Sequence, residues 1–256
     1  MKHNFLFNLY YNYISPFMTA AKTIRRNLKG TKFETDVWAM KEIVKPGWTC
    51  IDIGAAFGRY ALPMSKAVGK KGKVVCFEPG SYSFKVLGII KWFHRLKNVF
   101  IYKLAVSDKK GTINLHLPIK QNGKIGTCMA FISDTNENNT ISEPVKMTAI
   151  DDFCLDNEVE WADFIKCDTE GSEIRVIKGA QNYIKRCRPV ILCEIDIGAM
   201  SEYNYKVSEI EDFLKSISYK IFTYRDGKFI LHDKIIKTSN YFFIPAEKTI
   251  GARYAD

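Results

Sequence analysis

Short apolar runs alternate with longer amphipathic segments between residues 48 and 216. Five of these runs predict buried strands, which begin at Trp48 and continue at residues 73–77, 99–106, 162–168 and 190–195. The intervening segments repeat apolar residues every three or four positions, which predicts helices over residues 60–68, 81–95, 172–185 and 207–216. This alternation is typical of an α/β fold with a mostly parallel sheet covered by helices on both faces.

Weaker patterns surround this framework. Residues 112–117 alternate apolar and polar side chains and predict an exposed strand, and residues 118–147, rich in polar residues, predict a small β-excursion with a mobile loop. A strand-like run at residues 145–148 precedes a helix expected over 149–155. Near the end, residues 219–224 and 228–232 flank Arg225-Asp226-Gly227 and predict a hairpin, and residues 241–244 predict a late antiparallel strand.

Residues 1–46 are predicted to form a helical extension before a second unit, residues 47–256. The first 30 residues predict one or two helices broken near Pro16 and ended by Gly30, and residues 34–45 predict an amphipathic helix. Eight basic and three acidic residues fall in this extension, within a chain of net charge +10. The first interpretation is a solvated helix face, and the second is peripheral contact of residues 1–30 with a membrane surface or an acidic partner.

Composition narrows the class of protein. The chain has 256 residues, of which 46% are hydrophobic, but no run reaches the ~18 consecutive apolar residues of a spanning helix. Neither the seven cysteines nor the four histidines fall at the spacing of zinc ligands. Four of the cysteines lie in predicted buried strands, which indicates reduced thiols and a cytoplasmic location.

The stretch after the first strand predicts a nucleoside site. Asp52 ends that strand and is expected to point its carboxylate into the mouth of a tight loop that contains Gly54 and Gly58. The next strand ends in Glu78, whose carboxylate is placed to accept hydrogen bonds from a ribose diol. Because Asp52 would repel a pyrophosphate, the pattern favours a cationic ligand such as S-adenosylmethionine over a dinucleotide.

At the level of motifs, the chain resembles the FkbM family of S-adenosylmethionine-dependent methyltransferases. Six segments between about residues 47 and 196 carry the resemblance, in the family's order. They are Asp52-Ile53-Gly54-Ala55 with Gly58, Phe77-Glu78-Pro79, residues 104–108 with Gly111, residues 147–153, residues 165–173 with 176–180, and residues 189–194. The chain departs from the family at Ala56 and Phe57, and residues 1–33 and 118–145 have no counterpart.

The resemblance implies a Rossmann-like, seven-stranded methyltransferase fold in residues 47–256 and methylation of a hydroxyl on a small molecule, glycan or lipid. It also implies which residues bind S-adenosylmethionine: Asp52, Gly54, Ala55, Gly58, Glu78, Ser107, Asp108 and Asp168. Asp168 and Glu170 follow the fourth strand, and either is expected to remove the acceptor proton or to orient the cofactor. Glu173 is expected to cap the following helix.

Two other functions remain open from the sequence. Asp168, Glu194 and Asp196 follow neighbouring strands, and such oxygen ligands suit Mg²⁺ in a catechol-type, metal-assisted O-methyltransferase. The basic charge also allows a methyltransferase-fold protein that binds RNA. No nucleic acid partner is expected, because no RNA-binding module is recognisable, and no metal ligand is assigned.

Overall fold

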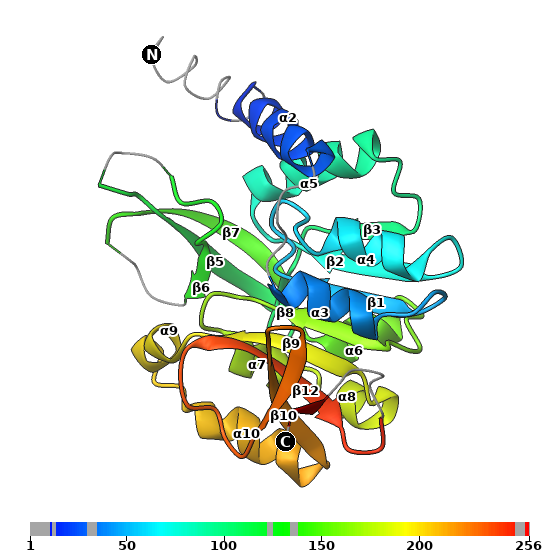
Figure 1. Cartoon of the computed structure of the whole chain (residues 1–256). Helices are drawn as coiled ribbons and strands as arrows, with labels where there is room; N and C mark the ends of the chain where they lie inside the picture. The colour runs from blue at the N-terminus through cyan, green and yellow to red at the C-terminus, as the bar shows by residue number, and fades with distance from the viewer. Residues whose placement is uncertain are drawn as a thin grey trace.

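The computed structural model describes residue 11 and residues 14–29, 35–121, 125–133, 138–248 and 254–255. Figure 1 shows a large sheet with helices on both faces, a second sheet projecting from one side, and helix α2 lying on helix α5. The predicted end of a helix at Gly30 lies outside the described residues. None of the described helices combines the length and apolar character needed to cross a membrane.

The large sheet confirms the predicted α/β class. Its order is β13-β11-β10-β12-β9-β8-β1-β2-β3. The strands are β1 (Thr49–Ile53), β2 (Lys73–Phe77), β3 (Val99–Tyr102), β8 (Phe164–Cys167), β9 (Val190–Ile195), β10 (Tyr219–Arg225), β11 (Lys228–His232), β12 (Ser239–Pro245) and β13 (Tyr254–Ala255). The five strands β3, β2, β1, β8 and β9 are parallel, and β12 is the antiparallel strand between β9 and β10.

The strand count differs from the expected seven. The predicted hairpin forms, but β11 adds an eighth strand beside β10, and β13 pairs with β11 as a ninth. Asp226 and Gly227 both have positive φ, +52° and +78°, as the two central residues of a tight hairpin turn require. The hairpin therefore adds strands to the sheet beyond β10, where the expected seven-stranded sheet would end.

Two apolar layers cover the sheet. One contains α3 (Thr35–Ile43) and α4 (Ala61–Val68), which pack with Cys50, Val74 and Phe164. The other contains α6 (Ile150–Asp156), α7 (Glu173–Lys178), α8 (Gln181–Cys187) and α10 (Val207–Ser216), which pack with Ile51 and Ile165. Because alternate residues of each strand enter opposite layers, the side of the sheet that any site residue faces follows from its position in the strand.

Helix α5 (Ser81–Phe93) joins the first layer to α2 (Ser15–Leu28). Its Leu87 packs with the sheet, whereas Tyr82, Val86 and Ile90 pack with Ala20 and Ile24 of α2. Helix α3, in contrast, shares its apolar cluster with β1 and β2. The domain boundary at residue 46 stays a prediction.

The β-excursion predicted within residues 118–147 is present and belongs to a second sheet. Strands β4 (Ala105–Val106), β5 (Gly111–Pro118), β6 (Phe131–Ser133) and β7 (Thr140–Thr148) pair in the order β4-β7-β5-β6. The expectation that residues 112–117 form an exposed strand is wrong for its second half, because Leu115 and Leu117 join Ile132 and Val145 in an apolar cluster. Residues 122–124 and 134–137 lie outside the described part.

Two predicted elements are divided. The third strand breaks into β3 and β4, and β4 pairs with β7 in the second sheet. The helix expected over 172–185 becomes α7 and α8, because Gly179 brings the backbone against Ser107: a Cβ on Gly179 would lie 2.1 Å from the Ser107 carbonyl oxygen. Asp151 then accepts hydrogen bonds from the N–H groups of Asn182 and Tyr183 and caps α8.

Candidate active site

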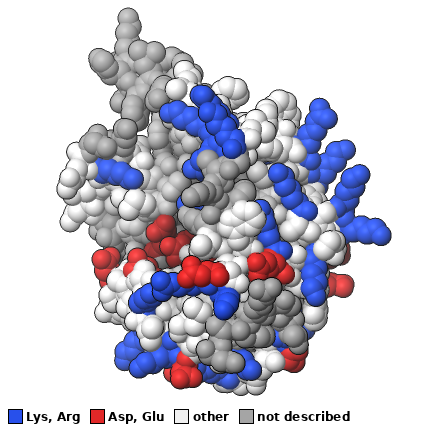
Figure 2. Space-filling model, in the orientation of Figure 1, with Lys and Arg blue, Asp and Glu red and all other residues white. Residues whose placement is uncertain are grey.

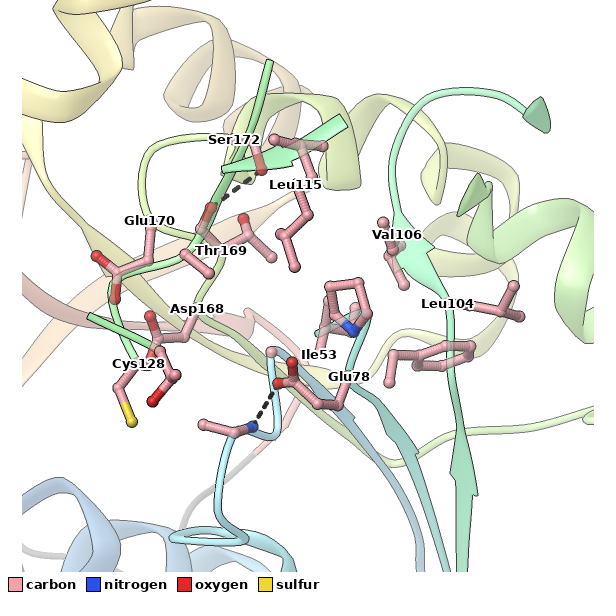
Figure 3. A pocket seen from close by; sticks show the side chains of 18 residues that line it. Ile53, Glu78, Leu104, Val106, Leu115, Cys128, Asp168, Thr169, Glu170 and Ser172 are labelled. Atoms are coloured by element: carbon pink, nitrogen blue, oxygen red, sulfur yellow. Dashed lines mark hydrogen bonds between the residues drawn. The ribbon is translucent and has the colours of Figure 1, made fainter. Parts of the chain in front are cut away.

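A cavity opens where β1, β2 and β8 end, under the second sheet. Figure 3 shows Glu78 near its centre, with Leu104 and Val106 toward one end and Asp168 and Glu170 toward the other. The second sheet contributes Leu115 and Ile132, and the segment before β6 contributes Thr127, Cys128 and Ala130. The cavity is therefore apolar at one end and acidic at the other.

The loop after β1 is fixed by backbone contacts. Gly54 has φ +78°, and a Cβ there would lie 1.8 Å from the Asp168 carbonyl oxygen, so only glycine fits. The N–H groups of Gly54 and Ala55 both donate to the carbonyl oxygen of Phe77, each at 3.0 Å. Gly54 lines the cavity, whereas Gly58 packs against Leu87 outside it.

Glu78 is buried and held by two backbone N–H groups. Its carboxylate accepts hydrogen bonds from Ala56, in the β1 loop, and from Gly80, just before α5, both at 2.8 Å. Burial raises the pKa of Glu78 to about 7, although these two hydrogen bonds favour the ionised form. The carboxylate is thus held at the middle of the cavity, and its role as an acceptor of ribose hydroxyls stays a prediction.

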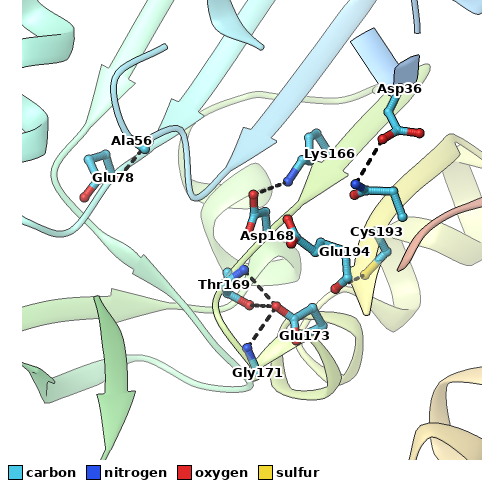
Figure 4. Close-up of polar contacts among 11 residues, drawn as sticks. Asp36, Ala56, Glu78, Lys166, Asp168, Thr169, Gly171, Glu173, Cys193 and Glu194 are labelled. Atoms are coloured by element: carbon cyan, nitrogen blue, oxygen red, sulfur yellow. Dashed lines mark hydrogen bonds and ion pairs between the residues drawn. The ribbon is translucent and has the colours of Figure 1, made fainter. Parts of the chain in front are cut away.

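The loop after β8 is organised around Glu173. One of its carboxylate oxygens accepts hydrogen bonds from the N–H groups of Thr169 and Gly171, at 2.8 and 3.2 Å, and from the Thr169 hydroxyl. These bonds curl residues 169–171 into the turn that precedes α7 (Figure 4). Glu173 therefore stabilises the loop before α7, and the expectation that its side chain caps α7 is wrong, because these hydrogen bonds go to residues that precede the helix.

Glu170 occupies this turn in an unusual conformation. Its φ is +54°, in the left-handed region that side-chain-bearing residues seldom adopt, and it lines the cavity. Burial, together with the carboxylates of Asp168 and Glu173, raises the pKa of Glu170 to about 7. Its carboxyl group can therefore accept or release a proton near neutral pH.

Asp168 forms an ion pair with a buried lysine that the sequence analysis did not single out. Lys166 Nζ lies 2.7 Å from Asp168 Oδ2, and the lysine side chain is 2% exposed (Figure 4). Burial opposes the charge of each partner, but their attraction outweighs it, so the pKa of Asp168 is lowered and that of Lys166 is raised. Asp168 is therefore ionised at neutral pH.

Two further carboxyl groups adjoin this pair. Glu194 of β9 is hydrogen-bonded to Asp168, and burial and the Asp168 charge raise the pKa of Glu194 to about 7. Asp52 is fully buried beside Lys166, its partner in the β1–β8 register, and burial raises its pKa to about 7 as well. Asp52 Oδ2 has no hydrogen-bond partner among the described residues.

Three predicted contact residues lie elsewhere. Asp52, expected to point into the loop mouth, does not line the cavity: it is buried beside Lys166 on the α3–α4 side of β1, opposite Ile51 and Ile53, and its contact with a cofactor stays a prediction. Ser107 is buried beside the α7–α8 junction, and Asp108 is exposed. Neither residue lines the cavity, so their predicted contacts gain no support.

The acidic residues proposed as magnesium ligands do not converge. No group of three or more His, Cys, Asp or Glu side chains in the described part of the chain is arranged to hold a metal ion. Asp196 instead caps α9 (Ile197–Glu202), where its side chain accepts hydrogen bonds from Gly198 and Ala199. This short helix, which sequence analysis missed, packs against Gly171 through Ala199.

The apolar and acidic side chains that line the cavity suit S-adenosylmethionine. Apolar side chains such as Leu104 and Val106 can contact an adenine ring, and the Glu78 carboxylate can accept hydrogen bonds from both ribose hydroxyls. Asp168 and Glu170 give the opposite end a negative character that suits a sulfonium and an ammonium group.

Comparison with known proteins adds a family match. A family model described as the methyltransferase FkbM domain matches residues 52–221. The chain is also similar to a solved FkbM methyltransferase from Methylobacillus flagellatus KT, with 16% identity, a TM-score of 0.49 and coverage of 77% of this chain. The chain spans 43% of the length of that structure. No curated protein matches it.

Two other solved structures are also similar to the chain. A SAM-dependent methyltransferase from Aquifex aeolicus is 16% identical, with a TM-score of 0.40 and coverage of 82% of this chain and 88% of that one. Fibrillarin from Aeropyrum pernix, solved with bound S-adenosyl-L-methionine, is 12% identical, with a TM-score of 0.45 and coverage of 82% and 73%. Because all of these TM-scores are below 0.5, the assignment rests on the family model.

Proposed function

We propose that the chain, which belongs to the FkbM methyltransferase family, uses S-adenosylmethionine to methylate a hydroxyl oxygen of a small molecule, glycan or lipid. The observation that carries this proposal is the pairing of a ribose-type acceptor, Glu78, with two carboxyl groups of contrasting pKa in one cavity. A carboxyl group that can act as a base supports a hydroxyl acceptor. A hydroxyl must lose its proton as it attacks, whereas a thiolate has no proton to lose.

Binding is assigned to the residues that line the cavity. Glu78 would hold the ribose, Leu104 and Val106 the adenine ring, and Gly54 the backbone of the loop beside the methionine end. Ala55 and Gly58 would act indirectly, by fixing the loop that carries Gly54 and Ala56. Asp168, kept ionised by Lys166, would orient the positively charged end of the cofactor.

The bound cofactor supplies an electrophilic methyl group and a neutral thioether leaving group. The protein must align the acceptor oxygen with that methyl group and take up the hydroxyl proton as the new bond forms. Glu170 suits the second task, because its pKa of about 7 lets an ionised fraction accept a proton at neutral pH. Asp168 suits it less, because its ion pair with Lys166 makes it a weak base.

The roles divide into two testable substitutions. Glu170→Gln removes the base and should lower kcat by ~10²–10⁴ while leaving S-adenosylhomocysteine affinity nearly unchanged. Asp168→Asn removes an orienting charge and should raise the KM for S-adenosylmethionine as well as lower kcat. Glu158→Gln is a matched control, because Glu158 is also an acid with positive φ, +53°, but is exposed and outside the cavity.

The assay is transfer of a labelled methyl group from S-adenosylmethionine to a panel of sugar, lipid and polyketide hydroxyls. Activity that survives EDTA would remove the metal-assisted mechanism. A Glu170→Gln enzyme with wild-type turnover would refute the assignment of the base, and a panel methylated only at nitrogen or sulfur would refute the acceptor class.

A further inference from the structure

The outward face of α2 has two adjacent stripes of different character. Helix α2 turns Ala20, Thr23 and Ile24 toward α5, where they are buried. Beside this buried face lies an exposed apolar stripe whose members recur at helical spacing, and Phe17 and Leu28 in this stripe are 63% and 69% exposed. The stripe consists of Ile14, Phe17, Ala21 and Leu28, with Met18 beside it.

A basic stripe runs along this apolar one. Lys22, Arg25 and Lys29 follow each other at spacings of three and four residues and are all exposed. The helix therefore has one apolar face that packs on the protein and a second apolar stripe that faces solvent, between that buried face and the basic stripe. A helix that only covers the domain needs the first face and not the second.

The neighbouring helix continues the same surface. Neither residues 15–29 nor residues 81–97 contain an aspartate or glutamate, whereas together they hold eight lysines and arginines. At the end of α5, Trp92 and Phe93 are 77% and 47% exposed beside a shallow hollow that Lys91, Arg95 and Lys97 help to line. In the view of Figure 2 the upper part of the molecule, where α2 and α5 lie, shows Lys and Arg and no acidic side chain.

We propose that this α2–α5 face docks on the surface of an anionic membrane. Exposed aromatic and aliphatic side chains would enter the headgroup region, and the basic stripe would pair with lipid phosphates and carboxylates. The absence of acidic residues from both helices suits an anionic bilayer, because the lipid headgroups would repel an aspartate or glutamate on this face. A protein partner would require no such uniform charge.

The α2–α5 face lies close to the β1–α4 loop, which carries Gly54 and Ala56 at the cavity. Tyr82, in the first turn of α5, hydrogen-bonds Ser15 and Thr19 of α2 through its hydroxyl and packs against Phe57 of the β1–α4 loop. Membrane contact at α2 would therefore hold this rim of the cavity near the bilayer. The docking itself is independent of the acceptor and of the proposed chemistry.

The test is sedimentation of the full chain with vesicles of phosphatidylcholine alone or mixed with phosphatidylglycerol. We expect binding to the anionic vesicles at low ionic strength, release at high ionic strength, and little binding to phosphatidylcholine alone. Joint replacement of the basic stripe (Lys22→Glu, Arg25→Glu, Lys29→Glu) should lower the partition coefficient by at least ~10-fold. Phe17→Ser with Leu28→Ser should also lower it.

Control variants carry the same changes at the other edge of the sheet. Lys220→Glu, Lys228→Glu and Lys234→Glu alter the net charge equally on exposed sites of β10 and after it, and Leu155→Ser with Leu231→Ser removes equally exposed apolar groups. These variants should bind the anionic vesicles like the wild type. S-adenosylhomocysteine binding reports whether each variant is folded.

Four results would overturn the proposal. They are no binding of the wild type to anionic vesicles at low ionic strength, equal binding to neutral vesicles, loss of binding in the control variants as large as in the α2 variants, and self-association abolished by Phe17→Ser with Leu28→Ser. The last result would show that a second copy of the chain covers the face. The first two do not depend on any variant.

Discussion

Lys166→Met tests the buried charge on which the proposed roles of Asp168 and Glu170 depend. Methionine keeps the length and apolar stem of lysine and removes only the ammonium group, so the packing of β8 between β1 and β9 should persist. The change leaves the Asp168 carboxylate, which lies 2.7 Å from Lys166 Nζ in the native protein, without this partner. Breaking a buried pair from one side costs ~3–5 kcal/mol.

The pH dependence separates this cost from a packing defect. In the wild type the folded-state pKa of Asp168 is lowered, so the stability it contributes is present above the unfolded value of 3.8 and is lost as pH falls below it. Without Lys166, burial would raise the folded-state pKa of Asp168 above the unfolded value, and ionised Asp168 would become a penalty as pH rises. The stability difference should therefore widen between about pH 4 and pH 8.

Urea unfolding at pH 5.5 and pH 8.0, followed by circular dichroism, measures this difference. The expected loss is ~3–5 kcal/mol at the higher pH and clearly less at the lower one. Lys178→Met is the control: it breaks the Lys178–Glu209 pair, which is 2.8 Å long but 44% and 38% exposed, and should have a much smaller effect. A loss for Lys166→Met that is equal at both pH values would refute the electrostatic reasoning.

Three further predictions concern the cofactor and the fold. Glu78→Ala should weaken S-adenosylhomocysteine binding by ~1–3 kcal/mol in calorimetry. Glu143→Ala removes a hydrogen bond to Ser81 at the start of α5 and should leave this binding unchanged. Equal losses in the two variants would refute the ribose role of Glu78. Because the pKa values of Glu78 and Glu170 are about 7 and a cation favours their ionised forms, S-adenosylmethionine affinity should rise between pH 6 and pH 8 more than that of S-adenosylhomocysteine; a constant ratio would contradict this. Gly179→Ala should destabilise the protein by more than ~1 kcal/mol, while Gly88→Ala, whose new Cβ meets nothing closer than 3.8 Å, should stabilise it by ~0.5–1 kcal/mol in the same thermal melts.

The framework of the fold was predictable because its strands are apolar on both faces and its turns carry strong signals. The parallel strands β1, β2, β8 and β9 are mostly apolar and almost entirely buried, which is typical of strands covered by helices on both sides. Asp226-Gly227 specifies a hairpin through two residues that tolerate positive φ. Such local signals do not depend on tertiary contacts.

The second sheet and α9 were not predictable in the same way. Much of β7 is polar and partly exposed, and Pro144 interrupts its donor pattern, so its pairing with β5 depends on the cluster around Leu115 and Val145. Helix α9 has six residues, too few for helical periodicity to be visible, and depends on the Asp196 cap. Both elements require contacts that no short window of sequence contains.

The position of the site was predictable, but which of its charged residues lie next to each other was not. Glu78, Gly54, Asp168 and Glu170 line one cavity, as acids and a glycine at neighbouring strand ends suggested. The facing of Asp52 was available from the alternation of Ile51, Asp52 and Ile53, and the isolated lysine in the apolar run 164–167 was a visible signal. That Asp52 lies beside Lys166 follows only from the register between β1 and β8, in which the two residues are opposite each other.

The acidic end of the cavity argues that cofactor binding and carboxyl ionisation are coupled. Glu170 and Glu194 have pKa values of about 7 mainly because burial disfavours their charged forms, and a cation that enters the cavity would reverse that preference. On the proposed roles, methyl transfer removes the sulfonium charge and leaves the acceptor proton on Glu170. Both changes abolish the same attraction, so the spent cofactor would be held less tightly than the fresh one. Asp168 stays ionised throughout because Lys166 holds it so, which keeps one fixed charge to bind the next cofactor.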